Sequence, residues 1–386
     1  MDASNAAKAS LRKEEGEASS AVDASSAVDA SATGGAPEGY VCSQGVAPWG
    51  DSPLELKAEL EAFGLAYREQ RRTFDREGAE EKKRRNNGGN GLFHSFALWV
   101  VLRRLRPGLV VETGVHVGQT SWLIRKASEE WKPRFVRIDP DGKWGFWRDG
   151  TTVDYIGRKS FRDFGEINWE GMGVDLSDAL VLMDDHIDQM TRLAQARDLG
   201  FVHLIYDDNY MPGFGDMFSI KSACDGSPSS SSPQQHKGDL HRAFSRESGV
   251  EVQRVRCRMP TASPRENCPV LGDEAAAELQ AELLSSAEVI WEFPPISRAA
   301  DPVEPKRWLG SGKALSLLGP VPWEREHTRL YRESTKEALF EGEEGEEEAA
   351  RLLGVDVEHV RLEANRYLNM VYIQLKTKPK EEKKEA

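Results

Sequence analysis

The sequence predicts an α/β fold with a doubly wound, mostly parallel sheet, and two observations lead to this prediction. The apolar run 109–111 is followed by a turn with two glycines and then by a helix from about Thr120. Two more apolar runs, 179–183 and 201–206, are separated by a stretch with the length of a helix. Buried parallel strands read as continuous apolar runs. Alternation of such runs with helices is typical of a parallel sheet.

The composition of the chain argues against several classes of protein. A formal net charge of -13 argues against a general nucleic-acid binder, because neutralising phosphates requires a basic surface. We find no apolar run of roughly 18 residues that would span a membrane, and no apolar core of a signal peptide. The cysteines, Cys42, Cys224, Cys257 and Cys268, lack the spacing of a metal site, so we expect free thiols. The expectation is a soluble, cytoplasmic protein without nucleic-acid or membrane partners, although an organelle is not excluded.

The 386 residues divide by composition into a folded region and low-complexity ends. Residues 1–38 are rich in Ala, Ser and acids and repeat a short motif, which predicts a disordered arm. A helical segment at 39–91 precedes an α/β domain at 92–376. We expect a low-complexity insertion at about 225–275 within that domain, because it begins with a Ser- and Pro-rich stretch. A charged tail, 377–386, follows.

Helix signals mark the region before the first strand. Ser52-Pro-Leu-Glu55 forms a capping box with proline at the first helical position, so we expect a helix to about Asp75. A second helix over 92–105 is predicted from apolar residues at helical spacing. Arginines near its end oppose the negative pole of the helix dipole. Pro107-Gly108 ends this helix and leads into the strand.

The turn after the first strand, Glu112-Thr-Gly-Val-His-Val-Gly-Gln-Thr-Ser121, carries the main functional signal. Gly114 and Gly118 permit backbone conformations that a side chain forbids, and they permit close approach to a ligand. Glu112 is unexpected in a dinucleotide-binding turn, because its charge would repel a pyrophosphate. An acid there suits a cofactor that carries hydroxyls and a positive charge.

This stretch resembles the first motif of class I S-adenosylmethionine-dependent methyltransferases. Within that class it is most similar to the E-T-G-V turn of the macrocin O-methyltransferase-like sugar methyltransferases. The resemblance implies a Rossmann-like fold in which the turn wraps the methionine end of the cofactor. The cofactor-binding residues of this region are then Glu112, Thr113, Gly114, Gly118 and Thr120. A Rossmann-like turn that binds another small molecule, or none, is the alternative.

Asp139 ends the second predicted strand, 134–139, and lies roughly 20 residues past the glycine turn. In nucleotide-binding βαβ units an acid at this place accepts hydrogen bonds from ribose hydroxyls. We therefore expect Asp139 to bind the ribose of the cofactor. The alternative, in which Asp139 opens a turn with Pro140-Asp-Gly142, is compatible with that role.

Acidic clusters follow the next two predicted strands. Asp184-Asp-His186 follows 179–183, and Asp207-Asp-Asn-Tyr210 follows 201–206. Because parallel strands end at the same edge of a sheet, we expect both clusters beside the glycine turn. Carboxylates gathered there repel one another unless a cation lies among them, and oxygen ligands suit Mg²⁺. The alternative is that these acids cap helices and close turns.

The resemblance extends to these clusters, because the sugar methyltransferases place one metal aspartate after the fourth strand and an Asp-Asp-Tyr after the fifth. The metal ligands that this implies are Asp184, Asp207 and Asp208. The chain departs from the pattern where Asn209 precedes Tyr210, and where His186 replaces the second carboxylate of a D-x-D. An imidazole can accept a hydroxyl proton near neutrality. His186 is therefore the candidate base, and Asp185 beside it is the other catalytic candidate.

The C-terminal part of the chain is predicted in less detail. A helix that includes 279–284 and a sixth strand at 287–293 follow from their apolar patterning. The acidic run 341–348 is interpreted as a solvated loop or the start of a helix. The segments 359–363 and 367–376 resemble the final C-terminal antiparallel hairpin of a class I methyltransferase.

The expected function is transfer of a methyl group from S-adenosylmethionine to a hydroxyl of a small molecule, such as a sugar or polyol, assisted by Mg²⁺ or another divalent cation. A metal-dependent glycosyltransferase is one alternative, because it also uses clustered aspartates to hold a nucleotide sugar. A non-catalytic binding protein on a methyltransferase-like scaffold is another, favoured by the altered D-x-D and the insertion. The oligomeric state is left open.

Overall fold

The computed structural model describes residues 43–50, 52–74, 90–140, 147, 149–157, 159–207, 209, 219–225, 241–244, 251–254, 273–297, 337–364 and 370–377. All of them belong to one unit, Gly39–Ala386. The predicted arm at 1–38, most of the predicted insertion and nearly all of the charged tail lie outside the described residues.

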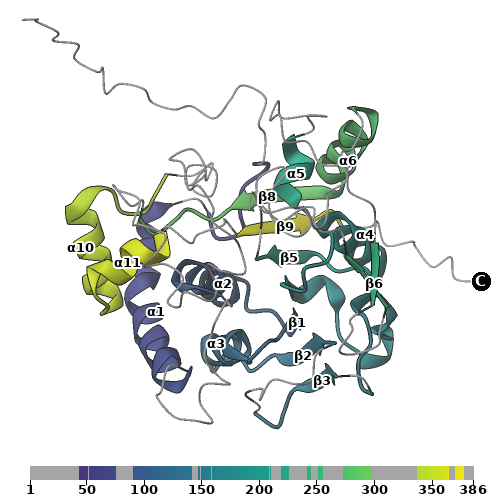
Figure 1. Cartoon of the computed structure of the whole chain (residues 1–386), viewed down its shortest axis with the longest axis horizontal. Coiled ribbons are helices and arrows are strands. Elements are labelled where there is room, and N and C mark those ends of the chain that lie inside the picture. Colours follow the sequence, from purple (N-terminus) through teal and green to yellow (C-terminus); the bar gives the residue numbers. More distant parts are fainter. Residues whose placement is uncertain are drawn as a thin grey trace, which may run out of the picture. The chain divides into compact units, whose positions relative to one another are not determined.

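Seven strands form one sheet in the order β3-β2-β1-β4-β5-β9-β8 (Figure 1). They are β1 (Leu109–Thr113), β2 (Arg134–Asp139), β3 (Val153–Ile156), β4 (Ala179–Met183), β5 (His203–Tyr206), β8 (Ala287–Glu292) and β9 (Val371–Leu375). The strands from β1 to β5 run parallel, whereas β9 is antiparallel to both of its neighbours. A separate antiparallel pair consists of β6 (His241–Phe244) and β7 (Glu251–Arg254). The predicted α/β class with a mostly parallel sheet is confirmed.

Helices cover both faces of the sheet, as the two helical layers in Figure 1 show. The core on one face contains residues of α1 (Pro53–Phe74), α2 (Leu92–Leu105), α3 (Gln119–Ala127), α10 (Gly342–Leu353) and α11 (Val357–Ala364). The core on the other face contains residues of α4 (Gln189–Leu199), α5 (Ile220–Asp225) and α6 (Asp273–Ser286). β4 is buried along its whole length, which is why it reads as a continuous apolar run. β1 is equally buried, although its apolar run 109–111 is followed by Glu112 and Thr113. Among the described helices we find none that is long and apolar enough to cross a membrane.

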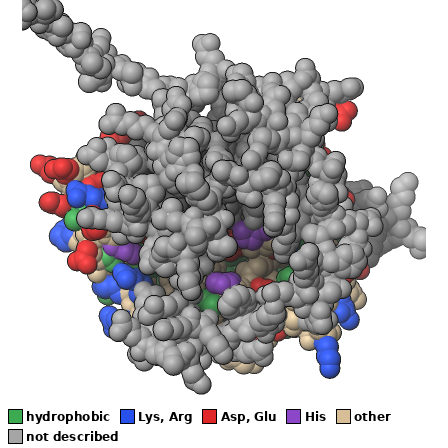
Figure 2. Space-filling model, viewed as in Figure 1, with side chains coloured by type: hydrophobic (Ala, Val, Ile, Leu, Met, Phe, Trp, Pro, Cys, Tyr) green, Lys and Arg blue, Asp and Glu red, His purple; other side chains and the backbone are tan. Residues whose placement is uncertain are grey.

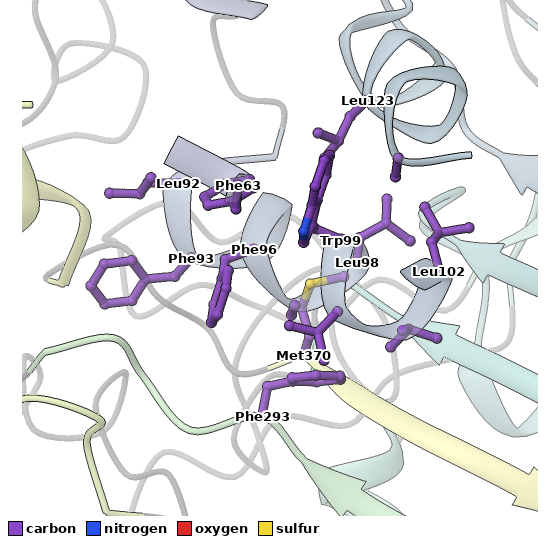
Figure 3. Packing of buried hydrophobic residues seen from close by; sticks show 14 of the residues in the cluster. Phe63, Leu92, Phe93, Phe96, Leu98, Trp99, Leu102, Leu123, Phe293 and Met370 are labelled. Carbon is purple, nitrogen blue, oxygen red and sulfur yellow. The ribbon is translucent and has the colours of Figure 1, made fainter. Parts of the chain in front are cut away.

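The core around α2 joins distant parts of the chain. Figure 3 shows Phe63 of α1 and Leu123 of α3 on the same side of α2 as Trp99, and Phe293 and Met370 on its other side. The ring centroids of Phe63 and Trp99 lie 6.0 Å apart. Because α2 is buried over most of its length, this packing fixes where its first turn lies.

The predicted C-terminal hairpin is wrong in its first segment, 359–363, which lies within α11. Val360, Glu363 and Ala364 are buried there, at the spacing of one helical face. β9 instead pairs with β8, a strand distant in the sequence, and it lies between β8 and β5. The acidic run 341–348 forms the start of α10, which is one of its two predicted states.

The expectation of free thiols is wrong at Cys224. This residue of α5 is disulfide-bonded, and the other three cysteines of the chain lie outside the described residues. Scattered spacing along the sequence does not indicate the bond, because separation along a chain does not report separation in space.

Candidate functional site at the carboxyl edge of the sheet

The carboxyl ends of the parallel strands bring several predicted site residues to one edge of the sheet. Thr113 of β1 pairs with Met183 of β4, and Met183 pairs with Tyr206 of β5. The residues that directly follow these strand ends are therefore neighbours across the sheet. They are Gly114, Asp184 and Asp207.

Gly114 allows the turn after β1 to lie directly against the loop after β4. Its φ of 83° is in the left-handed region, and a Cβ atom there would lie 1.9 Å from the carbonyl oxygen of Asp184. The amide of Asp184 donates to the carbonyl oxygen of Thr113 at 2.9 Å. The close approach that this glycine permits is therefore one between two segments of the protein itself.

Gly118 precedes α3 and also has a left-handed conformation, with a φ of 82°. A Cβ atom at this position would lie 3.0 Å from the backbone nitrogen of Trp147, which donates to the carbonyl oxygen of Val117. In the structure, Trp147 thus occupies one side of the glycine where the sequence predicted a ligand. The N-terminus of α3 has no side-chain cap among the described residues.

Asp139 fastens the glycine turn. Its Oδ2 atom accepts hydrogen bonds from the backbone amides of Val115 at 2.8 Å and His116 at 3.0 Å. His116 has a φ of 47°, which is unusual for a residue with a side chain and indicates local backbone strain. The carboxylate predicted to bind ribose therefore also shapes the turn that leads into α3.

Glu112 is fully buried beneath the turn rather than exposed to a ligand. Its Oε2 accepts a 2.5 Å hydrogen bond from Ser121 Oγ, and its Oε1 has no hydrogen-bond partner among the described residues. Burial raises the pKa of Glu112 to about 8, although Ser121 and Arg137 act in the opposite direction. Glu112 is therefore mainly uncharged at neutral pH. This differs from the sequence interpretation, in which its negative charge selected the cofactor.

The two threonines predicted to bind cofactor are buried and make hydrogen bonds within the protein. Thr113 Oγ1 donates to the carbonyl oxygen of Leu182 at 3.2 Å and so links β1 to β4. Thr120, in the first turn of α3, lies 3.1 Å from the side-chain amide of Asn90. Both hydroxyl groups therefore stabilise this edge of the sheet through hydrogen bonds to other parts of the protein.

The carboxyl group of Asp207 contacts several polar side chains at this edge. With the Asn90 amide turned to satisfy its neighbours, its nitrogen donates to both Asp207 oxygens at 2.8 and 2.7 Å, and its oxygen accepts from Thr120. His94 Nδ1 lies 3.2 Å from Asp207 Oδ1. Burial raises the pKa of Asp207, and the nearby His186 and a hydrogen bond with Asp184 act in the opposite direction. The fold thus brings Asp184 and Asp207 into direct contact.

His94 and Asn90 are the site residues that the sequence interpretation missed. His94 lies in the first turn of α2, and Asn90 lies just before that helix; both are buried. The available signal is that two polar residues, Asn90 and His94, stand four positions apart at the start of an otherwise apolar helix. Figure 2 shows histidine side chains near the centre of one face of the molecule, among acidic and apolar side chains.

His186 and Asp185 have different surroundings. His186 is half-buried and has a φ of 54°, a second strained non-glycine residue at this edge. Asp185 instead pairs with the buried Arg192, whose Nη2 lies 2.7 Å from its Oδ2. Arg192 also binds Asp163 through two hydrogen bonds of 2.8 Å. Asp185 is therefore part of an ion-pair network that anchors the loop, which does not suit a base.

A metal site is not formed by the described residues alone. Among them we find no group of three or more His, Cys, Asp or Glu side chains arranged to hold a metal ion. Asp184 and Asp207 are in contact, but Asp208, the third predicted ligand, lies outside the described residues. The donor set that the structure does show is two carboxyl groups with imidazoles beside them.

Comparison with known proteins does not assign a family. The chain matches no family model, and a search of curated proteins gives no significant match. The likeness to methyltransferases therefore rests on the quoted motifs.

Proposed function

We propose that this protein is an S-adenosylmethionine-dependent O-methyltransferase acting on a hydroxyl of a small, sugar-like or polyol-like molecule. The observation that carries the proposal is the arrangement of one sheet edge, where the glycine turn after β1 meets Asp139, Asp184 and Asp207. Doubly wound α/β proteins bind nucleotide-sized ligands at this edge. Carboxyl groups and imidazoles there are the groups that removal of a hydroxyl proton requires.

The order of the strands also supports the proposal. β3, β2, β1, β4 and β5 follow one another in the sheet, so the order in which the chain adds its parallel strands reverses between β1 and β4. Nucleotides bind at such a reversal in doubly wound proteins, in the crevice outside the carboxyl ends of the strands. β9, which lies in the second segment of the predicted hairpin, is antiparallel as the resemblance implies, although it pairs with β8 and not with 359–363.

The cofactor would be held by the turn 114–118 and by Asp139, and it supplies an electrophilic methyl group when bound. The fit is partial, because Oδ2 of Asp139 already accepts two amide hydrogens of the turn. A ribose would share this carboxylate with the turn. Glu112 would support the turn through Ser121, since it is buried and mainly uncharged at neutral pH.

In this proposal His186 accepts the proton of the acceptor hydroxyl. Its imidazole is half-buried and interacts electrostatically with Asp207. Although burial raises the pKa of Asp207, its ionised form would stabilise the protonated ring. Asn90 and His94 hold the Asp207 carboxyl in place. Orientation of the hydroxyl toward the methyl group would supply much of the rate acceleration.

The metal is a separable part of the proposal. Asp184 and Asp207 would hold Mg²⁺ together with Asp208, and oxygen ligands of this kind suit that cation. A chelator tests this part alone: loss of methyl transfer with EDTA and its return with Mg²⁺ support the metal. Undiminished transfer in EDTA would remove the metal from the proposal and leave methyl transfer standing.

A phosphate-bearing ligand, such as a nucleotide sugar, is the second candidate. The observation that favours it is the burial of Glu112, which raises its pKa to about 8, because an uncharged side chain does not repel phosphates as a carboxylate would. The N-terminus of α3, which follows Gly118, also favours negative charge. Binding of a nucleoside-diphosphate sugar, without binding of S-adenosylmethionine, would select this candidate.

The proposal is tested by incubating the protein with methyl-labelled S-adenosylmethionine and a metabolite extract. We expect label in small polar molecules, and we expect Asp207→Asn to slow the transfer at least about 100-fold. Asp198→Asn is the matched control, because Asp198 is an exposed acid of α4. Label transfer no greater than that of heat-inactivated protein would contradict the proposal. Binding without transfer, unchanged in Asp207→Asn, would indicate a non-catalytic binding protein.

A further inference from the structure

A buried polar network lies next to Asp207 and consists of Asn209, Lys221 and Glu292. All three are at most 1% exposed. Lys221 Nζ lies 3.1 Å from Glu292 Oε1, and the Asn209 amide donates to the same oxygen at 3.3 Å. The backbone amide of Lys221 donates to Asn209 Oδ1 at 2.8 Å. Asn209 therefore donates a hydrogen bond through its side-chain nitrogen and accepts one through its side-chain oxygen.

The network joins three elements at the carboxyl edge. Glu292 ends β8, Lys221 belongs to the first turn of α5, and Asn209 lies in the loop after β5. The backbone amide of Asn209 donates to the carbonyl oxygen of Asp207 at 3.0 Å, and the amide of Asp207 donates to Met183 at 3.2 Å. The chain is thus fixed at Asp207 and again at Asn209.

Stability alone is a weak reason for such a network. Removing an ammonium group and a carboxylate from water costs free energy that their attraction does not reliably recover, and apolar replacements are often neutral or stabilising. Here the pair is completely buried, and it lies at the edge where the glycine turn and the acid pair meet. A role in fixing the positions of neighbouring groups explains why the protein keeps an ion pair that costs free energy to bury. It also explains why the pair lies at this edge of the sheet.

We infer that Asn209, Lys221 and Glu292 are positioning residues that hold the Asp207 carboxyl against His94. The inference also gives a role to Asn209, the residue that stands between Asp207-Asp208 and Tyr210. An aspartate in place of Asn209 would lack a donor for Glu292 and would set a second carboxylate beside it. The role of Asp207 in the reaction rests on the proposed function. The claim that these three residues hold its carboxyl group in place does not.

The experiment detects a change in the position of Asp207 from the NMR signals of the His94 ring, which lies beside it. The ring nitrogens of His94 are observed by ¹⁵N NMR of the folded full-length protein, with His94→Gln identifying their signals. Asn209→Asp is compared with the double variant Asn209→Asp/Glu292→Gln, which exchanges the carboxylate and the amide and restores the net charge of the network. Glu282→Gln is the control, because it breaks an ion pair of 3.0 Å with Arg197 elsewhere in the molecule.

We expect Asn209→Asp to shift the Nδ1 signal of His94, the double variant to return it to the wild-type position, and the control to leave it unchanged. If Asn209→Asp does not fold, a folded double variant with the wild-type signal supports the inference. A wild-type signal in folded Asn209→Asp would overturn it. So would an unfolded double variant, or one with a displaced signal, because the exchange conserves the charges, donors and acceptors of the network.

Titration of the wild-type protein with S-adenosylmethionine separates the two claims. Absence of binding, with the predicted NMR pattern intact, means that the proposed function fails and the positioning role stands. Binding by the wild type together with an unmoved His94 signal in Asn209→Asp means the reverse.

Discussion

At the scale of single residues, burial and hydrogen bonding set the role of each carboxyl group at the sheet edge. Glu112 lies in the sheet with one oxygen that has no hydrogen-bond partner among the described residues, and burial raises its pKa to about 8. Asp139 binds the amides of the glycine turn, and Asp185 pairs with Arg192. Asp207 is buried, and its carboxyl group accepts hydrogen bonds from Asn90 and lies beside His94. Carboxyl groups at one edge of the sheet therefore differ in their burial and in the groups that they bind.

The pKa of Glu112 predicts how its replacement changes stability with pH. Between about pH 4.5 and 8 the unfolded chain loses this proton before the folded chain does, which destabilises the fold. Below this range Glu112 is protonated in both states, and above it the penalty is constant. Glu112→Gln should therefore gain stability relative to the wild type as pH rises through this range. The expected total is on the order of 5 kcal/mol.

Urea unfolding of both proteins at several pH values measures this difference. Ser121→Ala is a useful control, because it removes the hydrogen bond to Glu112 but leaves the carboxyl group buried. A difference between Glu112→Gln and the wild type that stays flat from acid to alkaline pH would show that Glu112 is ionised in the folded protein.

Gly114 provides a second prediction at this scale. Gly114→Ala should destabilise the protein by about 4 kcal/mol or prevent folding, because a Cβ atom meets the Asp184 carbonyl and φ is positive. Gly150→Ala is the matched control, since Gly150 has a φ of 77° but, among the described residues other than its chain neighbours, no atom lies within 4 Å of the place that a Cβ would take. It should cost about 1 kcal/mol from backbone strain alone. Equal losses in the two variants, measured by urea unfolding, would show that the Asp184 contact is unimportant.

Individual site residues are predictable only where a strand end places them. Gly114, Asp184 and Asp207 directly follow parallel strands, so polarity and strand order are enough to bring them together. His94 and Asn90 reach Asp207 from another element, and that contact depends on how α2 packs on the sheet. The burial of Glu112 depends on α3 covering it, which a linear pattern does not show.

At the scale of elements, the start of α2 is held by the C-terminal helix α11. Glu363 Oε2 accepts a 2.7 Å hydrogen bond from the backbone amide of Leu92, and a Cβ atom at Gly91 would lie 2.3 Å from the same oxygen. A carboxylate at a helix N-terminus satisfies a free amide and opposes the positive pole of the helix dipole. The position of His94, in this first turn, depends on the cap.

Removal of this cap should destabilise the protein. We expect Glu363→Ala to lower the free energy of unfolding by about 1 to 2 kcal/mol, because a buried amide loses its acceptor. Glu363→Gln keeps an acceptor and should lose less than about 1 kcal/mol. Glu358→Ala, at an exposed position of α11, should change stability by less than about 0.5 kcal/mol. The prediction fails if urea unfolding shows the same loss for Glu358→Ala as for Glu363→Ala.

The elements with a strong local pattern are predictable from the sequence. The apolar parts of β1 and β4 read as short apolar runs because they are buried, and α2 as an apolar run at helical spacing. The segment 359–363 resembles a hairpin strand, but its buried residues Val360, Glu363 and Ala364 follow the period of a helix. Similarity between short segments is weaker evidence than periodicity there.

At the scale of the whole molecule, one sheet brings distant parts of the chain to a common edge. β9, near the C-terminus, lies between β5 and β8, and Glu292 at the end of β8 thereby reaches the loop after β5. The parallel order of β1, β2, β4 and β5 follows from alternating strands and helices. The insertion of β9 and the contact of Glu292 with Asn209 do not, because they depend on pairing across a long separation in sequence.

The central claim is that this edge of the sheet binds S-adenosylmethionine, and calorimetric titration of the folded protein with that cofactor tests it most directly. We expect saturable binding with a dissociation constant below about 1 mM. Binding should be weaker for Asp139→Ala and unchanged for the control Asp198→Asn. A wild-type protein that took up no cofactor at millimolar concentration, or an Asp139→Ala variant that bound it as tightly as the wild type, would show that this edge is not the cofactor site.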